Sequence, residues 1–76
     1  MTDIEIEYCV PCGMLDRAQN VQAALLEQFG QRLDTVALRT GDSGVFRVAV
    51  DGDRVFDKAE DEYDVDAIVE RVRAHV

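Results

Sequence analysis

The chain has 76 residues, of which 47% are hydrophobic, and carries a formal net charge of −8. This length allows a single domain over residues 1–76, and the hydrophobic share is enough for a packed core rather than a disordered chain. Because this charge repels nucleic acids and anionic membranes, we expect neither as a partner. No run approaches the roughly 18 apolar residues of a membrane-spanning helix, and residues 1–3 are not a basic signal segment, so we expect a cytoplasmic protein.

The acidic composition is poor in lysine. Lys58 is the only lysine among 8 basic residues, and ten of the 16 acidic residues are aspartate. This bias resembles the surfaces of proteins from halophilic archaea, in which high salt screens the repulsion between like charges. An ordinary acidic protein is the alternative interpretation, and composition alone leaves both open.

The first predicted strand covers residues 3–8, in which apolar and polar side chains alternate. Alternation is the period of a half-buried strand, with one face packed and one face in water. Ile4, Ile6 and Tyr8 occupy the apolar face. We therefore expect both helices of the domain to cover that face, while the acidic face stays open.

The first predicted helix covers residues 12–29. Its apolar residues recur at helical spacing, and Gly30 follows as a left-handed C-terminal stop. Pro11 lacks a backbone N–H and suits the first turn, where that donor would have no partner. The segment 8–13, Tyr-Cys-Val-Pro-Cys-Gly, thus joins a strand to a helix, and it contains both cysteines of the chain.

The second half of the chain predicts three strands and a helix. The predicted strands are residues 33–39, 45–50 and 54–57. A turn is expected at 40–43, and Asp51-Gly52 favours a two-residue hairpin turn. After a charged loop at 58–63, Asp64 caps the last helix. The apolar stripe of that helix consists of Val65, Ile68, Val69, Val72 and Val76.

This order predicts an α/β domain with a thioredoxin-like fold, β-α-β-β-β-α. The first three elements form a right-handed unit with parallel strands, and the last three form an antiparallel hairpin followed by a helix. Joined in one four-stranded mixed sheet, they have the expected strand order 2-1-3-4, with both helices on one face. A short extended link can step over the first strand, but the order 1-2-3-4 remains open.

Cys9 and Cys12 are the candidate catalytic residues. Thiol–disulfide exchange needs an attacking and a resolving thiol, and two cysteines three positions apart can close a small ring. On the predicted helix, both sulfurs would lie near the unpaired N–H groups of the first turn, which lower the pKa of a thiol below about 8.5. In a cytosol such a disulfide is transient and catalytic rather than structural.

Two alternatives give the cysteines no redox role. A zinc site needs four ligands, whereas this chain offers two thiols and His75 near its end, so zinc would have to bridge two chains in a dimer. The other alternative is a pair of inert core cysteines, which the junction position disfavours. We expect no resident metal or other cofactor, an exposed His75 and a monomeric protein.

Other residues near the dithiol are candidates for shaping a substrate site: Tyr8, Val10, Pro11, Gly13 and Phe46. The two aromatic residues of this set also fit a purely structural role in the core, as does Met14. A charge run that predicts a solvated loop consists of Asp57, Glu60, Asp61 and Glu62.

Two motifs resemble those of a known family. They are Ile6-Glu7-Tyr8-Cys9-Val10-Pro11-Cys12-Gly13, and Gly44-Val45-Phe46-Arg47-Val48 followed by Val50-Asp51-Gly52. In this order and spacing they resemble the Rdx family of SelT, SelW and SelH selenoproteins and their cysteine homologues, above all the short prokaryotic members related to selenoprotein W. The resemblance covers nearly the whole chain. It implies a thioredoxin-like fold and a thiol oxidoreductase acting with glutathione or another small thiol.

The resemblance and the comparison with thioredoxin disagree about the attacking sulfur. In selenoprotein members the selenocysteine takes the second motif position, which is Cys12 here. In thioredoxins the first and more exposed cysteine attacks, which would be Cys9, and helix geometry favours Cys9 for exposure. Pro11 is the only proline, so the cis-proline that thioredoxins place against their disulfide has no counterpart. That departure disfavours general protein-disulfide reduction and favours a small thiol or one dedicated partner.

The sequence thus supports two classes of function. The first is a small cytosolic thiol–disulfide oxidoreductase that uses Cys9 and Cys12 on a glutathione-like thiol or one redox partner protein. The second is a non-catalytic binding module whose dithiol senses the redox state. An enzyme would turn over with a reductant, whereas a sensor would change its affinity for a partner on oxidation.

Overall fold

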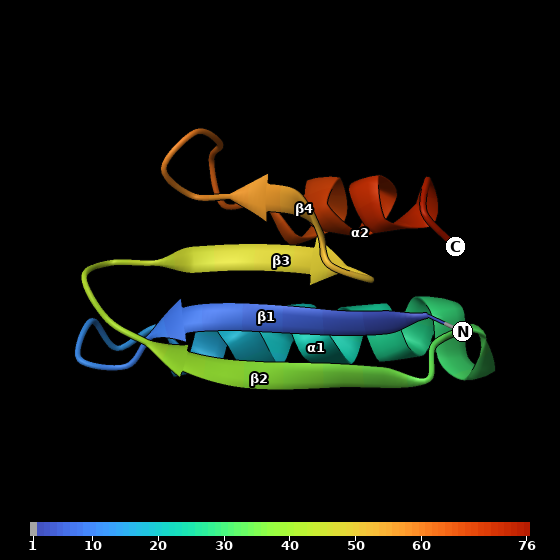
Figure 1. Ribbon diagram of the computed structural model, residues 1–76, viewed down its shortest axis with the longest axis horizontal. Helices are drawn as coiled ribbons and strands as arrows, with labels where there is room; N and C mark the ends of the chain where they lie inside the picture. Colours follow the sequence, from blue (N-terminus) through green and yellow to red (C-terminus); the bar gives the residue numbers. More distant parts are fainter. Residues whose placement is uncertain (1) are drawn as a thin grey trace.

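The computed structural model describes residues 2–76 as a four-stranded sheet with two helices (Figure 1). The elements are β1 (Asp3–Cys9), α1 (Leu15–Phe29), the 3-10 turn η1 (Gly30–Arg32), β2 (Thr35–Gly41), β3 (Phe46–Val50), β4 (Asp53–Asp57) and α2 (Val65–Arg73). Their order confirms the predicted β-α-β-β-β-α succession. Neither helix within residues 2–76 is long and apolar enough to cross a membrane.

The strand order is β2-β1-β3-β4, which confirms the predicted order 2-1-3-4 and excludes 1-2-3-4. β1 pairs in parallel with β2 and antiparallel with β3, and β3 pairs antiparallel with β4. The β2–β3 link therefore crosses the end of β1 (Figure 1). Asp51 and Gly52 join β3 to β4 with φ of 51° and 89°, as the hairpin turn requires.

Both helices lie behind the sheet in Figure 1, on the same face, as predicted. The alternation of β1 decides which face they cover: Ile4, Ile6 and Tyr8 are buried, while Asp3 and Glu5 are exposed. α1 contributes every third or fourth residue to the same core, namely Ala18, Val21, Leu25 and Phe29. The covered face is thus the hydrophobic core of the domain.

Two interactions at its N-terminal end hold α2 in place. Asp64 caps its first turn by accepting hydrogen bonds from the backbone N–H groups of Asp66 and Ala67, at 3.0 and 3.3 Å. Its buried residues are Ile68, Val69 and Val72, as the apolar stripe predicted. Just before the helix, the ring of Tyr63 packs edge-to-face on Phe46, with 5.6 Å between the ring centroids. This contact ties the start of α2 to β3.

The other face of the sheet, which we call the open face, carries ion pairs instead of helices. Arg39 of β2 pairs with Glu5 of β1 at 3.2 Å, and Arg47 of β3 pairs with Glu7 of β1 at 3.5 Å. All four side chains are at least partly exposed, at 28% or more. The wet acidic face predicted from the β1 alternation is therefore confirmed, and arginines from both neighbouring strands balance its acids.

Four local predictions were wrong. The first helix begins at Leu15 rather than at residue 12. The second strand begins at Thr35 rather than at residue 33, because Leu33 caps η1 and Asp34 lies in a bend. It extends to Gly41, so the turn falls later than 40–43. Asp57 belongs to β4 and is 9% exposed, so it is not part of a solvated loop.

Asp57 is buried because its carboxylate has three donors. It accepts hydrogen bonds from the backbone N–H of Ala59 at 3.0 Å, from Arg54 at 2.7 Å and from Arg47 at 3.4 Å. The Ala59 N–H, followed by the two guanidinium groups, holds the pKa of Asp57 below its usual range, against the opposing effect of burial. The carboxylate therefore joins the β3–β4 hairpin to the chain that follows it.

Candidate functional site

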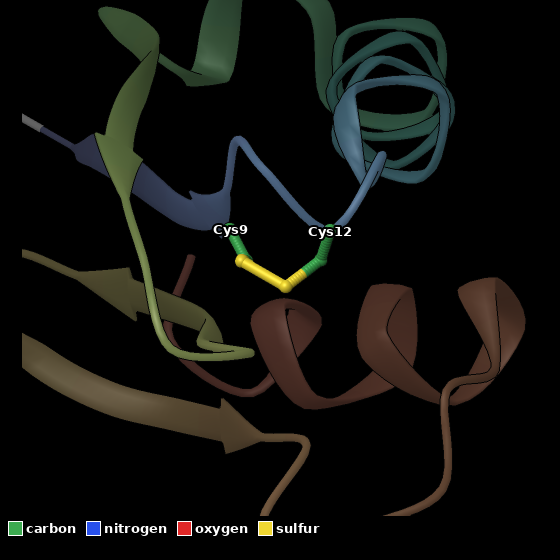
Figure 2. Close-up of a disulfide and its surroundings, with 2 residues drawn as sticks. All are labelled: Cys9 and Cys12. Carbon is green, nitrogen blue, oxygen red and sulfur yellow. A yellow bond between two sulfur atoms is a disulfide. The ribbon is translucent and has the colours of Figure 1, made fainter.

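The two cysteines form a disulfide at one end of the sheet (Figure 2). Cys9 is the last residue of β1, and Cys12 lies in the turn between β1 and α1. Their Cα atoms are 5.3 Å apart, within the range that a disulfide spans. The structure therefore describes the oxidised form of the predicted dithiol.

The segment between the cysteines is a hydrogen-bonded turn and not the first turn of a helix. The N–H of Val10 donates to the carbonyl of Gly41 at 3.0 Å, and the N–H of Gly13 donates to the carbonyl of Val10 at 3.1 Å. Gly13 has a φ of +73°, in the left-handed region. An α-helix cannot pass through that conformation, so α1 begins only after it. Cys12 is thus presented by a tight turn that β2 anchors.

The two sulfurs differ in accessibility. Cys9 is fully buried, at 0% exposure, whereas Cys12 is exposed. The expectation that Cys9 is the more exposed cysteine is therefore wrong. Its basis was a helix starting at residue 12, whereas the strand continues through Cys9 and holds that residue in the sheet.

The predicted substrate-shaping residues separate into two groups. Val10, Pro11 and Gly13 are exposed on the turn beside Cys12, where a partner can touch them. Tyr8 and Phe46 pair across β1 and β3 and are 8% and 0% exposed. The two aromatic residues thus support the site from the core and do not line its surface.

One surface residue of the site was missed by the sequence analysis. Leu15, the first residue of α1, is 43% exposed, and Val10 is 50% exposed. Val10 precedes Cys12 in the sequence and Leu15 follows it. Leu15 has the helical spacing of the apolar stripe, but it is the first residue of α1. The buried residues of the helix begin one turn later, at Ala18.

The segment before α2 is attached to the start of α1. The hydroxyl of Tyr63 donates to the carbonyl of Arg17 at 3.3 Å, and the Arg17 guanidinium lies 5.1 Å from the centre of the same ring. Burial raises the pKa of Tyr63 above its usual value. The phenol thus stays protonated at neutral pH and keeps its role as a donor.

The part of the chain that the structure describes contains no cluster of metal ligands within one chain. No group of three or more His, Cys, Asp or Glu side chains within residues 2–76 is arranged to hold a metal ion. His75 is exposed near the C-terminus, as predicted.

The Rdx family model matches residues 3–74. The chain belongs to the Rdx family. A crystal structure of a Bordetella parapertussis protein is 35% identical, with a TM-score of 0.92 over 99% of this chain and 98% of that one. The crystal structure of a selenoprotein W-related protein from Vibrio cholerae is 25% identical, with a TM-score of 0.88 over 96% of this chain and 94% of that one. No curated protein matches the chain.

These similarities confirm the resemblance predicted from the two motifs, and with it the thioredoxin-like fold. Membership of the Rdx family, together with a disulfide in the C-x-x-C turn, indicates a redox function for this Rdx protein. The two cysteines of this site differ in exposure, and that difference bears on which sulfur reacts first.

Proposed function

We propose that this Rdx protein is a cytoplasmic thiol–disulfide oxidoreductase in which Cys12 exchanges with the partner and Cys9 resolves. The observation that carries the proposal is the disulfide between a fully buried and an exposed cysteine. Thiol–disulfide exchange requires access to the attacked sulfur. Exposure therefore favours Cys12, the position that selenocysteine takes in the selenoprotein members of the family.

The reaction follows from the oxidised form. A partner thiolate attacks Sγ of Cys12, so that a mixed disulfide forms and Cys9 leaves as a thiolate. A second partner thiolate then attacks the mixed disulfide, which releases the partner as a disulfide and leaves Cys9 and Cys12 reduced. Two electrons pass to the protein, and both thiolates take their protons from solvent. In the reverse direction, the Cys12 thiolate attacks a partner disulfide and releases one partner thiolate. Cys9 then resolves the mixed disulfide by attacking Sγ of Cys12, which forms the Cys9–Cys12 bond and releases the second partner thiolate.

The surface around Cys12 favours a partner with an apolar patch. Three large apolar side chains of residues 2–76 are exposed, and two of them, Val10 and Leu15, flank Cys12 in the sequence. Glutathione is anionic and would meet a chain with a net charge of −8, which opposes its approach at low salt. A dedicated protein partner is therefore our first choice and a glutathione-like thiol our second.

The first experiment is a redox titration of the purified protein in high salt against glutathione buffers, with free thiols as the readout. We expect a reversible two-electron transition at a potential between roughly −300 and −120 mV. If both thiols stay unreactive until the protein is unfolded, the oxidoreductase proposal is wrong.

Single-cysteine variants test the roles of the two sulfurs. Cys9→Ser keeps the exposed thiol and should form a mixed disulfide with oxidised glutathione rapidly in the native state. Cys12→Ser is the matched variant that keeps the buried thiol, and it should react much more slowly. The reverse order of rates would assign the attack to Cys9.

The same apolar surface also fits the second class of function, a redox-sensing binding module. Turnover separates the two: catalytic amounts of an enzyme should consume a reductant in the presence of a disulfide substrate. A sensor would instead bind a partner with different affinity in its oxidised and reduced forms, without sustained consumption.

A further inference from the structure

The β2–β3 loop, residues 42–45, crosses β1 at the level of Cys9. Cys9 pairs with Gly41 at the end of β2, and Tyr8 pairs with Phe46 at the start of β3. Because β2 and β3 lie on opposite sides of β1, the loop must pass from one side of Cys9 to the other. Figures 1 and 2 show this loop crossing the end of β1 and running past the disulfide.

Val45 is the residue of this loop that reaches back across β1. A Cβ atom on Gly41 would lie only 2.7 Å from Cγ1 of Val45 and 3.2 Å from Cγ of Glu7. Neighbouring strands are about 4.8 Å apart, so β3 lies about 10 Å from β2, further than a valine side chain reaches. The Val45 side chain therefore reaches back across the end of β1 on the open face that Glu7 occupies, beside Gly41, the residue that pairs with Cys9.

The side chain of Val45 approaches the backbone of Gly41 closely. With no side chain of its own, Gly41 leaves room for Cγ1 of Val45 beside the end of β2. Valine is stiff at χ1, so this methyl group cannot swing away without moving the loop. The contact thus holds the loop against β1 beside a cysteine that is 0% exposed.

We propose that Val45 shields Cys9 from the open face, so that a partner sulfur can reach only Cys12. This inference rests on the proposed function and adds its regiochemistry. When a partner thiolate opens the disulfide, the bond forms on Sγ of Cys12 and Cys9 leaves as a thiolate. In the reverse direction, after the Cys12 thiolate has attacked a partner disulfide, the shielded Cys9 attacks Sγ of Cys12, which forms the Cys9–Cys12 bond and releases the remaining partner thiolate. Val45 is a positioning residue and takes no part in the chemistry.

The test measures how fast iodoacetamide alkylates Cys9 in the native protein. The background is Cys12→Ser, so that Cys9 is the only thiol. We expect Val45→Ala to raise the rate of alkylation by about tenfold or more, because local protection is lost. Val45→Ile keeps the branched side chain and should leave the rate unchanged. An unchanged rate in Val45→Ala would overturn the proposal.

A stability control separates local shielding from general loosening. Val72, fully buried in the C-terminal half of α2, loses the same atoms in Val72→Ala. In Val72→Ala, the rate of Cys9 alkylation should rise no more than the loss of unfolding free energy predicts. In Val45→Ala, the rate should rise more than the loss of unfolding free energy in that variant predicts. If both variants follow the same relation, Val45 has no specific shielding role.

A second variant approaches the shield from the neighbouring strand. Gly41→Ala leaves Val45 unchanged in the sequence but puts a methyl group only 2.7 Å from its Cγ1. We expect it to displace the loop and to accelerate Cys9 alkylation in the same background. If the redox titration fails but Cys9 alkylation accelerates as expected, the oxidoreductase proposal is wrong and the shielding role of Val45 stands. If the titration is normal but the alkylation rates are unchanged, the shielding role is wrong and the oxidoreductase proposal stands.

Discussion

The two faces of the sheet are held by different forces, although they share the same strands. On the covered face, Ile6 of β1 is fully buried under the helices. On the open face, the neighbouring Glu5 pairs with Arg39, and their side chains are 50% and 64% exposed. Apolar burial contributes about 25 cal/mol per Å² removed from water, whereas exposed ion pairs contribute roughly 0–1 kcal/mol each. The covered face therefore supplies the stability, and the open face supplies charge balance.

The dithiol lies where these two environments meet. Cys9 ends the central pairing strand and is buried with it, while Cys12 sits three residues later on a turn that solvent reaches. The rate of thiol–disulfide exchange depends on access to the attacked sulfur, and the two cysteines differ in that access. Three measurements on the strands test this contrast between the faces.

The largest effect is expected on the covered face. Ile6→Ala should lower the unfolding free energy by about 2–5 kcal/mol, because it removes a fully buried side chain and leaves a cavity. Urea unfolding followed by circular dichroism measures this loss. Glu5→Ala, at the adjacent position on the open face, is the matched control and should cost less than about 1 kcal/mol. Equal losses in the two variants would contradict the division between the faces.

A smaller effect is expected at Asp57, where a carboxylate is buried among donors. Asp57→Asn should lower the unfolding free energy by about 1 kcal/mol at neutral pH, because Arg47 and Arg54 lose a charged acceptor. The lowered pKa of Asp57 means that this contribution is present above the unfolded value of about 3.9 and is lost as the pH falls through the folded value.

The pH dependence provides the check on that assignment. Urea unfolding of the wild type and of Asp57→Asn should be compared from neutral pH down to acid. The difference between the two proteins should shrink as the pH drops below about 4. A difference that stays constant across this range would mean that the carboxylate charge does not stabilise the hairpin.

The smallest effect is expected for the exposed pair of the open face. Arg39→Ala should change the unfolding free energy by less than about 0.5 kcal/mol, because both side chains are half exposed or more. The change should diminish further as salt is added. A loss comparable to that of Ile6→Ala would show that the open face is a structural surface in its own right.

Local signals in the sequence were enough for most of the fold. The alternation over residues 3–8 identified β1 and both of its faces, because side chains of a strand point to opposite sides regardless of what covers them. Gly30, Asp51-Gly52 and Asp64 ended α1, turned the hairpin and capped α2 as expected, because each depends on its own backbone and nearest neighbours. The C-x-x-C spacing likewise located the dithiol.

The tertiary structure decided what those signals could not. Whether Cys9 or Cys12 is exposed depends on how far β1 continues along β2, which holds Cys9 in the sheet. The burial of Asp57 depends on arginines that only the folded hairpin brings to it. The elements, their order and the place of the dithiol could be predicted from the sequence, since they rest on periodicity and turn chemistry. Which sulfur is exposed was decided by packing between segments more than thirty residues apart, whose contacts have no local pattern.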